Sequence, residues 1–176
     1  MPALKRSPEN ANLLQPTKFL LSFDRIGTSQ FFCQTVNIPG INLGSASINT
    51  PVADIYAPGN KITYEQLSVS FIINENVQTW QDIHSWFRSI ASPEGFNERN
   101  RLSNIQNQFS KSKQKNYSDA TLTVLSALNN PLLRIQFLNA FPTSLSGIEF
   151  DTTKSAETII TASATFRFDY FNFIDA

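Results

Sequence analysis

The sequence is poor in the residues that most often carry catalysis or bind metals. It contains one cysteine, Cys33, and one histidine, His84. A single cysteine excludes an intramolecular disulfide framework and favours assembly in a reducing compartment. His84 has no second histidine with which to share a metal, so we interpret it as a structural or solvated residue. No nucleotide-binding or hydrolase motif is present. We therefore expect no catalytic residues, no metal site and no cofactor.

Long apolar runs and a net charge are also lacking. No segment has transmembrane length, and no apolar stretch follows Lys5 and Arg6 as it would in a secretory signal. Basic and acidic residues number 14 each, so the formal net charge is zero. This balance argues against a protein that attracts nucleic acid over its whole surface. We expect a soluble protein, made in a cytoplasm, with no membrane partner.

The balanced charge conceals one basic segment. Between residues 97 and 116, five basic residues stand against one acidic residue, a net charge of +4. The basic residues are Arg99, Arg101, Lys111, Lys113 and Lys115. Because so long a polar loop is unusual in a compact domain, we interpret 94–117 as an insertion that is functional, disordered or ordered by a partner. The remaining sequence suits a polar N-terminal arm, 1–16, followed by a single domain over 17–176.

The clearest local pattern lies between residues 64 and 90. Over 67–73, Leu67, Val69 and Phe71 alternate with small polar residues, which predicts a strand with one buried face. Apolar residues then recur at steps of three and four, which predicts a helix. Its expected buried stripe consists of Trp80, Ile83, Phe87 and Ile90. Asn74 and Asn76 are candidate N-caps, and Ser92, Pro93 and Gly95 predict the end of the helix.

Other alternating patterns predict further strands. Strands over 18–24 and 31–38 are expected to form an antiparallel hairpin, with Cys33 and Thr35 on one face. Strands are also expected over 119–128, 132–141 and 144–150, with a bend at Pro142, and the longest over 158–173. The last is expected to point Ala162, Ala164, Phe166, Phe168 and Tyr170 to one side. The fold class is mainly β: an antiparallel β-sandwich or barrel with one flanking α-helix.

The stretch 44–60 predicts a hairpin of a different kind. Two short, weakly apolar strands, 45–50 and 53–57, surround Pro51, and Pro58-Gly59-Asn60 is typical of a turn. Residues 61–64 are expected to begin the strand that continues through 67–73. The hairpin has too few large apolar residues for a core of its own. It is therefore either a mobile loop or an arm that reaches another chain.

Polar faces of two predicted strands leave two interpretations open. They carry Ser68, Ser70, Thr161, Ser163, Thr165, Arg167 and Asp169. These residues form an ordinary solvated sheet face, or they line a pore built from several copies whose open strand edges are completed by neighbours. A different class of function is a monomeric β-sandwich binding module, in which the basic 97–116 loop grips an acidic ligand or nucleic acid.

A series of motifs carries a family resemblance. In order they are Pro16-Thr17-Lys18-Phe19, Phe32-Cys33-Gln34 leading to Ile38-Pro39-Gly40, the polar hairpin ending in Pro58-Gly59-Asn60, Leu67-Ser68-Val69-Ser70-Phe71, the predicted helix, Phe141-Pro142-Thr143-Ser144-Leu145-Ser146, and Thr165-Phe166-Arg167-Phe168-Asp169-Tyr170. With this order and spacing, residues 17–173 resemble the tail tube proteins of T4-like contractile-tailed bacteriophages, a family that includes tube initiators at the baseplate.

The resemblance implies a structural virion protein. Six copies would form a ring with an inter-subunit β-barrel, and stacked rings would form the inner tail tube that conducts DNA during ejection. The hairpin would be an arm to the adjacent ring or subunit, through Ser47, Asn49, Val52, Ile55, Tyr56 and Asn60. The seven polar-face residues named above would be lumen-facing candidates. A baseplate-proximal tube initiator is the alternative role.

The resemblance also implies partners and a location. The partners would be further copies of the chain, the tail sheath, baseplate hub or initiator proteins, and a tape-measure protein. DNA would pass through the lumen without sequence-specific contacts. The location would be the phage tail, and the host cytoplasm during assembly.

Overall fold

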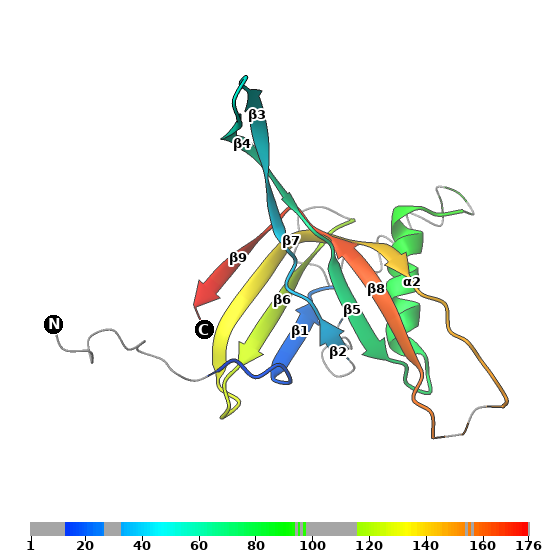
Figure 1. The fold of residues 1–176 in the computed structure, drawn as a ribbon. Helices are drawn as coiled ribbons and strands as arrows, with labels where there is room; N and C mark the ends of the chain where they lie inside the picture. Colours follow the sequence, from blue (N-terminus) through cyan, green and yellow to red (C-terminus); the bar gives the residue numbers. More distant parts are fainter. Residues whose placement is uncertain are drawn as a thin grey trace, which may run out of the picture.

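The computed structural model describes residues 13–26, 33–93, 95, 97, 116–153, 155 and 157–175. The described chain is mainly antiparallel β-structure with one helix, as the sequence predicts. Its elements are β1 (Phe19–Phe23), β2 (Cys33–Val36), β3 (Ile41–Asn49), β4 (Asp54–Tyr64), β5 (Leu67–Ile72), α2 (Gln78–Ile90), β6 (Ser118–Leu125), β7 (Pro131–Leu145), β8 (Thr161–Arg167) and β9 (Tyr170–Asp175). Figure 1 shows a body of curved strands, with α2 beside it and the β3–β4 hairpin projecting away.

The long strand β7 connects two groups of strands in the body. The strand order is β1-β6-β7-β8-β5-β2, with β9 also paired to β7. Residues before position 141 of β7 pair with β6 and β9, and residues 141–145 pair with β8. The register shifts between Pro142 and Ser144, at the point where the partners change. The body thus contains a β1-β6-β7-β9 layer and a β2-β5-β8-β7 layer that share one strand.

Aromatic side chains fill the space between these layers and α2. The ring centroids of Phe23 and Phe166 lie 4.7 Å apart, and Trp86 meets Phe23 edge-on at 6.2 Å. Leu67, Val69 and Phe71 are buried, which confirms the predicted core face of β5. No helix among the described residues is long and apolar enough to cross a membrane.

The helix confirms the predicted position but not every detail. It begins at Gln78, after Val77 in a left-handed conformation, and ends at Ile90, before the predicted stop signals. The Asn74 side-chain oxygen accepts a hydrogen bond from the Gln78 amide at 3.0 Å, although Val77 occupies the N-cap position. The predicted stripe omitted Trp86, which is fully buried.

The predicted hairpin between the first two strands is wrong. β1 pairs with β6, whereas β2 pairs with β5 at the other end of the strand order. The register of β2 also shifts between Cys33 and Thr35, so Cys33 lies opposite Phe71 and Thr35 opposite Ser70. An extra residue in one strand moves side chains to the other face, and the predicted common face of Cys33 and Thr35 is therefore also wrong.

Two further strand boundaries differ from the predicted ones, because glycine and proline residues lie here inside strands and not at their ends. Pro58, Gly59 and Asn60 lie inside β4, and the turn at the tip of the hairpin spans 50–53. Accordingly, 61–64 ends β4 and does not begin β5. Pro142 lies inside β7, where it marks the change of partner strand, and residues 146–150 are not in a strand. A register irregularity accommodates such a residue without ending the strand.

The predicted 158–173 strand is divided in two. β8 ends at Arg167 and β9 begins at Tyr170, so β7 is the longest strand. The break shifts the alternation: Ala162, Ala164 and Phe166 are buried as expected, but beyond it Phe171 is buried and Tyr170 is 44% exposed. The amide of Asp169, within the break, donates to the Leu138 carbonyl at 3.1 Å. The chain therefore changes its pairing to β7 at this point.

Candidate assembly surfaces

The register brings the predicted lumen-facing residues of β5 and β8 together on one outer face. Ser68 lies opposite Thr165, and Ser70 opposite Ser163. Paired residues in an antiparallel sheet share a face, and this face is opposite to the buried Leu67 and Phe71. Thr161 is exposed at the start of β8, opposite Ile72. The result is a sheet surface of small hydroxyl side chains.

Two residues that the sequence did not single out extend this surface across all four strands. The Thr143 hydroxyl of β7 lies 3.0 Å from the Thr165 hydroxyl, and Thr35 of β2 lies opposite Ser70. Both are exposed. We call the outer surface of β2-β5-β8-β7 the hydroxyl face. The register shifts beside Thr35 and Thr143 hid them from an argument based on strict alternation.

The two charged candidates lie at the end of this surface. Arg167 is exposed at the last position of β8, opposite Phe141. Asp169 lies beyond β8, and its carboxylate accepts a hydrogen bond from the Asn139 side-chain amide at 2.6 Å. Asn139 has a positive φ of 54°. Its backbone N–H donates a hydrogen bond to the Asp119 carboxylate at 3.1 Å. Asp169 thus fastens the β8–β9 break to β7, in addition to being exposed.

The β3–β4 hairpin, which we call the arm, forms a separate two-stranded sheet. Ser47 lies opposite Tyr56, Asn49 opposite Asp54, and Ile48 opposite Ile55. Val52 is 94% exposed in the tip turn, which the Thr50 side chain closes by accepting the Ala53 amide at 3.1 Å. Asn60 is exposed in β4, where the register shifts. All six predicted arm residues therefore lie on the projecting hairpin (Figure 1).

The basic residues of the predicted insertion lie outside the described residues, as do positions 1–12 of the predicted N-terminal arm. This applies to Arg99, Arg101, Lys111, Lys113 and Lys115. Asn116, near the end of the predicted insertion, is described, and its carbonyl accepts a hydrogen bond from the Trp86 indole at 3.1 Å. Arg25 lies at 5.3 Å over the Trp86 ring and donates to the Ser89 hydroxyl at 3.0 Å. Burial lowers the pKa of Arg25 to about 10.

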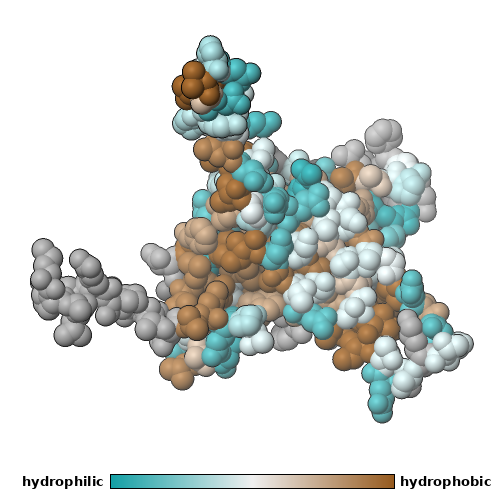
Figure 2. All heavy atoms as spheres, viewed as in Figure 1, coloured by the Kyte–Doolittle hydropathy of each residue, from teal (hydrophilic) through white to brown (hydrophobic). Residues whose placement is uncertain are grey.

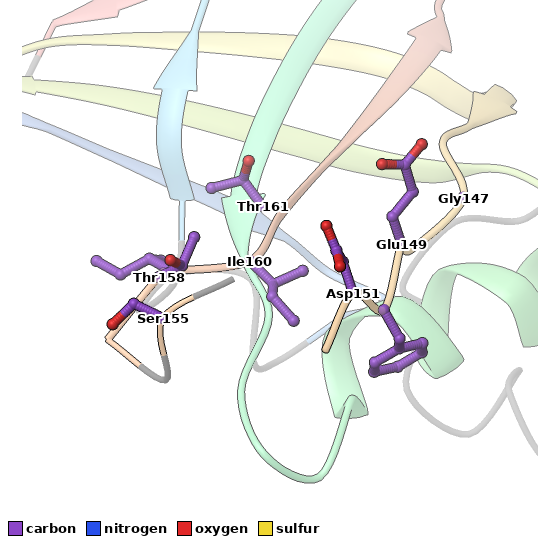
Figure 3. A pocket seen from close by; sticks show the side chains of 9 residues that line it. Gly147, Glu149, Asp151, Ser155, Thr158, Ile160 and Thr161 are labelled. Carbon is purple, nitrogen blue, oxygen red and sulfur yellow. The ribbon is translucent and has the colours of Figure 1, made fainter. Parts of the chain in front are cut away.

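An open cavity of about 460 Å³ is lined by residues between the end of β7 and the start of β8. Figure 3 shows Glu149 and Asp151 on one wall and Ser155 and Thr158 on the opposite one. Hydrogen bonds from Thr153 hold the pKa of the Asp151 carboxyl below its usual value. Within the described ranges, no three His, Cys, Asp or Glu residues are grouped as a metal site would require. We therefore interpret Glu149 and Asp151 as two solvated carboxylates.

The histidine and the cysteine both have structural surroundings. The exposed His84 ring stacks on Trp80 at 5.3 Å, and the Trp80 indole donates to the Ser146 carbonyl at 3.0 Å. Cys33 is half-buried against the core, where desolvation raises the pKa of its thiol to about 11. A thiol with a raised pKa is a poor nucleophile at neutral pH.

This arrangement, a mainly antiparallel body with one flanking helix and one projecting arm, matches the fold of tube proteins of contractile systems. The sequence model of the phage tail tube protein family matches residues 13–174. The chain belongs to the phage tail tube protein family. That family consists of structural tail proteins, so the chain is a structural protein and not an enzyme.

Individual relatives show how widely the fold is used. The chain is 23% identical over 167 residues to the tail tube terminator protein of Enterobacteria phage T4, covering 91% of this chain and 88% of that protein. It is similar to a chain of the sheath/tube terminator of the PVC extracellular contractile injection system in its extended state, with a TM-score of 0.65, 18% identity and coverage of 94% and 99%. It is also similar to a chain of the anti-feeding prophage baseplate, solved with 6-fold symmetrisation, with a TM-score of 0.60, 12% identity and coverage of 94% and 98%.

These comparisons make the chain a component related to the tail tube of a contractile tail, and hence of a virion. The similar folds occur both in a terminator and in a baseplate complex. Fold alone therefore does not assign the chain to one position along the tube. The sequence alone predicts a repeating subunit or an initiator, and the relatives add the terminator as a third position.

Proposed function

We propose that the chain forms a six-membered ring that terminates the inner tail tube, with the hydroxyl face lining the DNA conduit. The observation that carries this proposal is the four-stranded β2-β5-β8-β7 layer, which has a polar outer face and an open edge at β2. In the described residues, β2 pairs only with β5. An open edge presents unpaired N–H and C=O groups, and soluble proteins commonly cover such edges.

The strand directions suit closure into a ring. Each neighbouring pair in β2-β5-β8-β7 is antiparallel, so β2 and β7 point in opposite directions. Residues 141–145 of β7 have only β8 as a strand partner in the described chain. When copies are related by rotation about a ring axis, β2 of one copy meets β7 of the next in the antiparallel direction. The same pairing pattern then continues around the whole ring.

The chemistry of the hydroxyl face suits a conduit. Serine and threonine hydroxyls tolerate water but present no fixed positive charge to phosphate, so DNA can pass without being retained. Arg167 and Asp169 carry opposite charges at its end. A strongly basic lining would bind DNA tightly, with an affinity that falls steeply with salt. We therefore propose passage without sequence-specific contacts.

The terminal position rests on the relationship to the phage T4 tail tube terminator, which covers most of both chains. A repeating tube subunit and a baseplate-proximal initiator are the competing positions. In each case the arm, through Ser47, Asn49, Val52, Ile55, Tyr56 and Asn60, would contact an adjacent ring or subunit. The sheath, baseplate hub proteins and a tape-measure protein are further proposed partners, and assembly would take place in the host cytoplasm.

The test is electron microscopy of the purified chain, alone and with tubes of its cognate repeating subunit, with masses in solution measured alongside. A terminator is expected to form single rings that bind tube ends without elongating. Long hollow filaments of the chain alone would indicate the repeating subunit, and rings formed only with baseplate proteins the initiator. A monomer under every condition would overturn the ring.

A crosslinking experiment tests the proposed edge pairing directly. In a Cys33→Ser background, Thr35→Cys and Thr143→Cys place thiols on the exposed side of the two edges. A short bismaleimide is expected to produce a ladder of covalent oligomers up to six copies. Either single-cysteine variant, assembled in the same way, should give no ladder. Assembled rings that yield no ladder would contradict pairing between β2 and β7.

For the arm, Ile55→Asp is expected to prevent ring-to-tube contact while leaving the ring intact. A charge at a contact that excludes water costs several kcal/mol. Its location in the arm, away from the core, should leave the monomer folded. Normal binding to tube ends would argue against the arm assignment.

A further inference from the structure

The last strand, β9, is an open edge of the sheet. In the part of the chain that the structure describes, β9 pairs only with β7. From Phe166 to Asp175, β8 and β9 keep one register along β7, so both follow the same edge of it. On the far side of β8 stands β5, which begins only at Leu67, and no described strand lies beside β9 there. Backbone N–H and C=O groups of β9 are therefore available to a further strand.

This edge cuts through a row of core residues on the inner face of the β1-β6-β7-β9 layer. The row consists of Leu21, Leu122, Ile135 and Phe173, each paired with the next. The first three are at most 2% exposed, whereas Phe173 is 61% exposed. Figure 2, in the view of Figure 1, shows apolar surface on the side of the body where β9 lies. A further strand beside β9 would complete the row.

The chain before β1 contains a segment of matching length. Residues 9–15 stand between Pro8 and Pro16, and a proline limits a strand because it cannot donate to the ladder. The stretch has seven residues, and β9 has six. Leu13 and Leu14 of this segment are 92% and 65% exposed. Because successive side chains of a strand point to opposite faces, one leucine would cover the inner face of β9 and the other its outer face.

The segment cannot reach the β9 edge of its own chain. Gln15 is four residues from Phe19, where β1 begins, and an extended chain spans at most about 14 Å over that separation. A strand added beyond β9 would stand four strand spacings from β1, roughly 19 Å along the sheet. A segment that pairs with β9 must therefore come from a second copy.

The neighbouring copy in the proposed ring is placed to supply it. β6 and β9 both pair with residues 133–137 of β7, so they occupy opposite edges of that strand. The free side of β9 therefore faces the same way as β5 and β2, and β1 lies at the opposite end of the strand order. The copy whose β7 meets β2 thus turns its β1, with the chain before it, toward β9.

We propose that residues 9–15 of this neighbouring copy add a strand to β9. The inference rests on the proposed ring, in which each copy would donate one such segment and accept another. Main-chain hydrogen bonds to the open edge would provide affinity, and the two leucines would provide specificity, as in other cases of strand addition.

A crosslink between two populations of the full chain tests the contact. Both carry Cys33→Ser. One adds Asn12→Cys, at the centre of the segment, and a tag that raises its mass, and the other adds Asn172→Cys, at the centre of β9. Side chains on adjacent strands lie within reach of a short bismaleimide. Assembled together, the two populations should give a covalent dimer of one tagged and one untagged chain. In the matched control, Ile159→Cys, which is 66% exposed between β7 and β8, replaces Asn172→Cys and should give none.

A second variant measures what the segment contributes. Leu13→Ser with Leu14→Ser should raise the concentration at which half of the chain is in rings by roughly tenfold or more, since buried apolar anchors dominate an interface. Both leucines are exposed in the monomer, so the thermal unfolding midpoint of the dilute chain should not change. Mass photometry measures the half-assembly concentration.

Three results would overturn the contact while leaving the ring in place. They are rings without the tagged–untagged dimer, a crosslink within single dilute chains that carry both cysteines, and rings of the double leucine variant at the wild-type concentration. A wild-type chain that never forms rings would overturn the proposed ring together with this contact, and mass photometry of the unmodified chain identifies that case.

Discussion

The β5–β8 pair and the β3–β4 arm are both antiparallel ribbons, but their burial differs. In β5, buried Leu67, Val69 and Phe71 alternate with more exposed serines, whereas every residue of β3 is exposed. The first ribbon has a core against which one face packs. The second has apolar residues on both faces, and it meets the core through Tyr64 at its root. The arm is therefore held by its hairpin hydrogen bonds, and we propose that contacts with another chain complete it.

The largest expected effect is a difference between the two ribbons in the unfolding free energy that is lost when an apolar side chain is truncated. Phe71→Ala should lower the free energy of unfolding by about 3–5 kcal/mol, because it leaves a cavity beside Phe166 and Ile83. The matched arm variant, Ile48→Ala, removes a side chain that is 55% exposed and should change stability by less than about 0.5 kcal/mol. Urea unfolding of the dilute monomer measures both. Equal effects would contradict the separation of core and arm.

The sequence predicts the core ribbon better than the arm for a physical reason. Alternation in 67–73 reflects one buried face, and the structure confirms it in Leu67, Val69 and Phe71. In the arm, Pro58, Gly59 and Asn60 suggested a turn because these residues usually serve there. Here they accommodate an irregular register opposite Gly44. Whether such residues form a turn or an irregularity within a strand depends on the strand opposite. A local sequence pattern carries no information about that strand.

The residues of the hydroxyl face were predictable from the sequence only in part. Ser68, Ser70, Ser163 and Thr165 followed from alternation, and the register places them on one face. Thr35 and Thr143 did not follow, because each lies beside a register shift. The division of the last predicted strand into β8 and β9 depends on pairing with two different parts of β7. These features depend on pairings between residues that are distant in the chain, and local sequence patterns therefore did not predict them.

A smaller and strictly local effect is expected in the arm. Gly59→Ala forces the arm backbone apart because the new Cβ would contact the Gly44 carbonyl. Amide hydrogen exchange should accelerate at residues 45–57 and stay unchanged in β5 and β8. Gly147→Ala is the matched control, since a Cβ there meets nothing within 4 Å. Unchanged exchange in the arm would show that the two halves of the hairpin do not depend on the glycine contact.

The smallest expected effect concerns the body alone and appears only at high pH. Burial raises the pKa of Cys33 from 9.0 to about 11, so the folded state favours the neutral thiol. The resulting stability is fully present below pH 9 and is lost as the pH rises through about 11. Because Cys33 is only partly buried, we expect a loss of about 1 kcal/mol or less over this window. Urea unfolding of wild type and Cys33→Ala between pH 8 and 11 isolates this contribution, since every other titrating group is common to both. Parallel curves would show that Cys33 has the same pKa folded and unfolded, and that the edge strand β2 does not desolvate it.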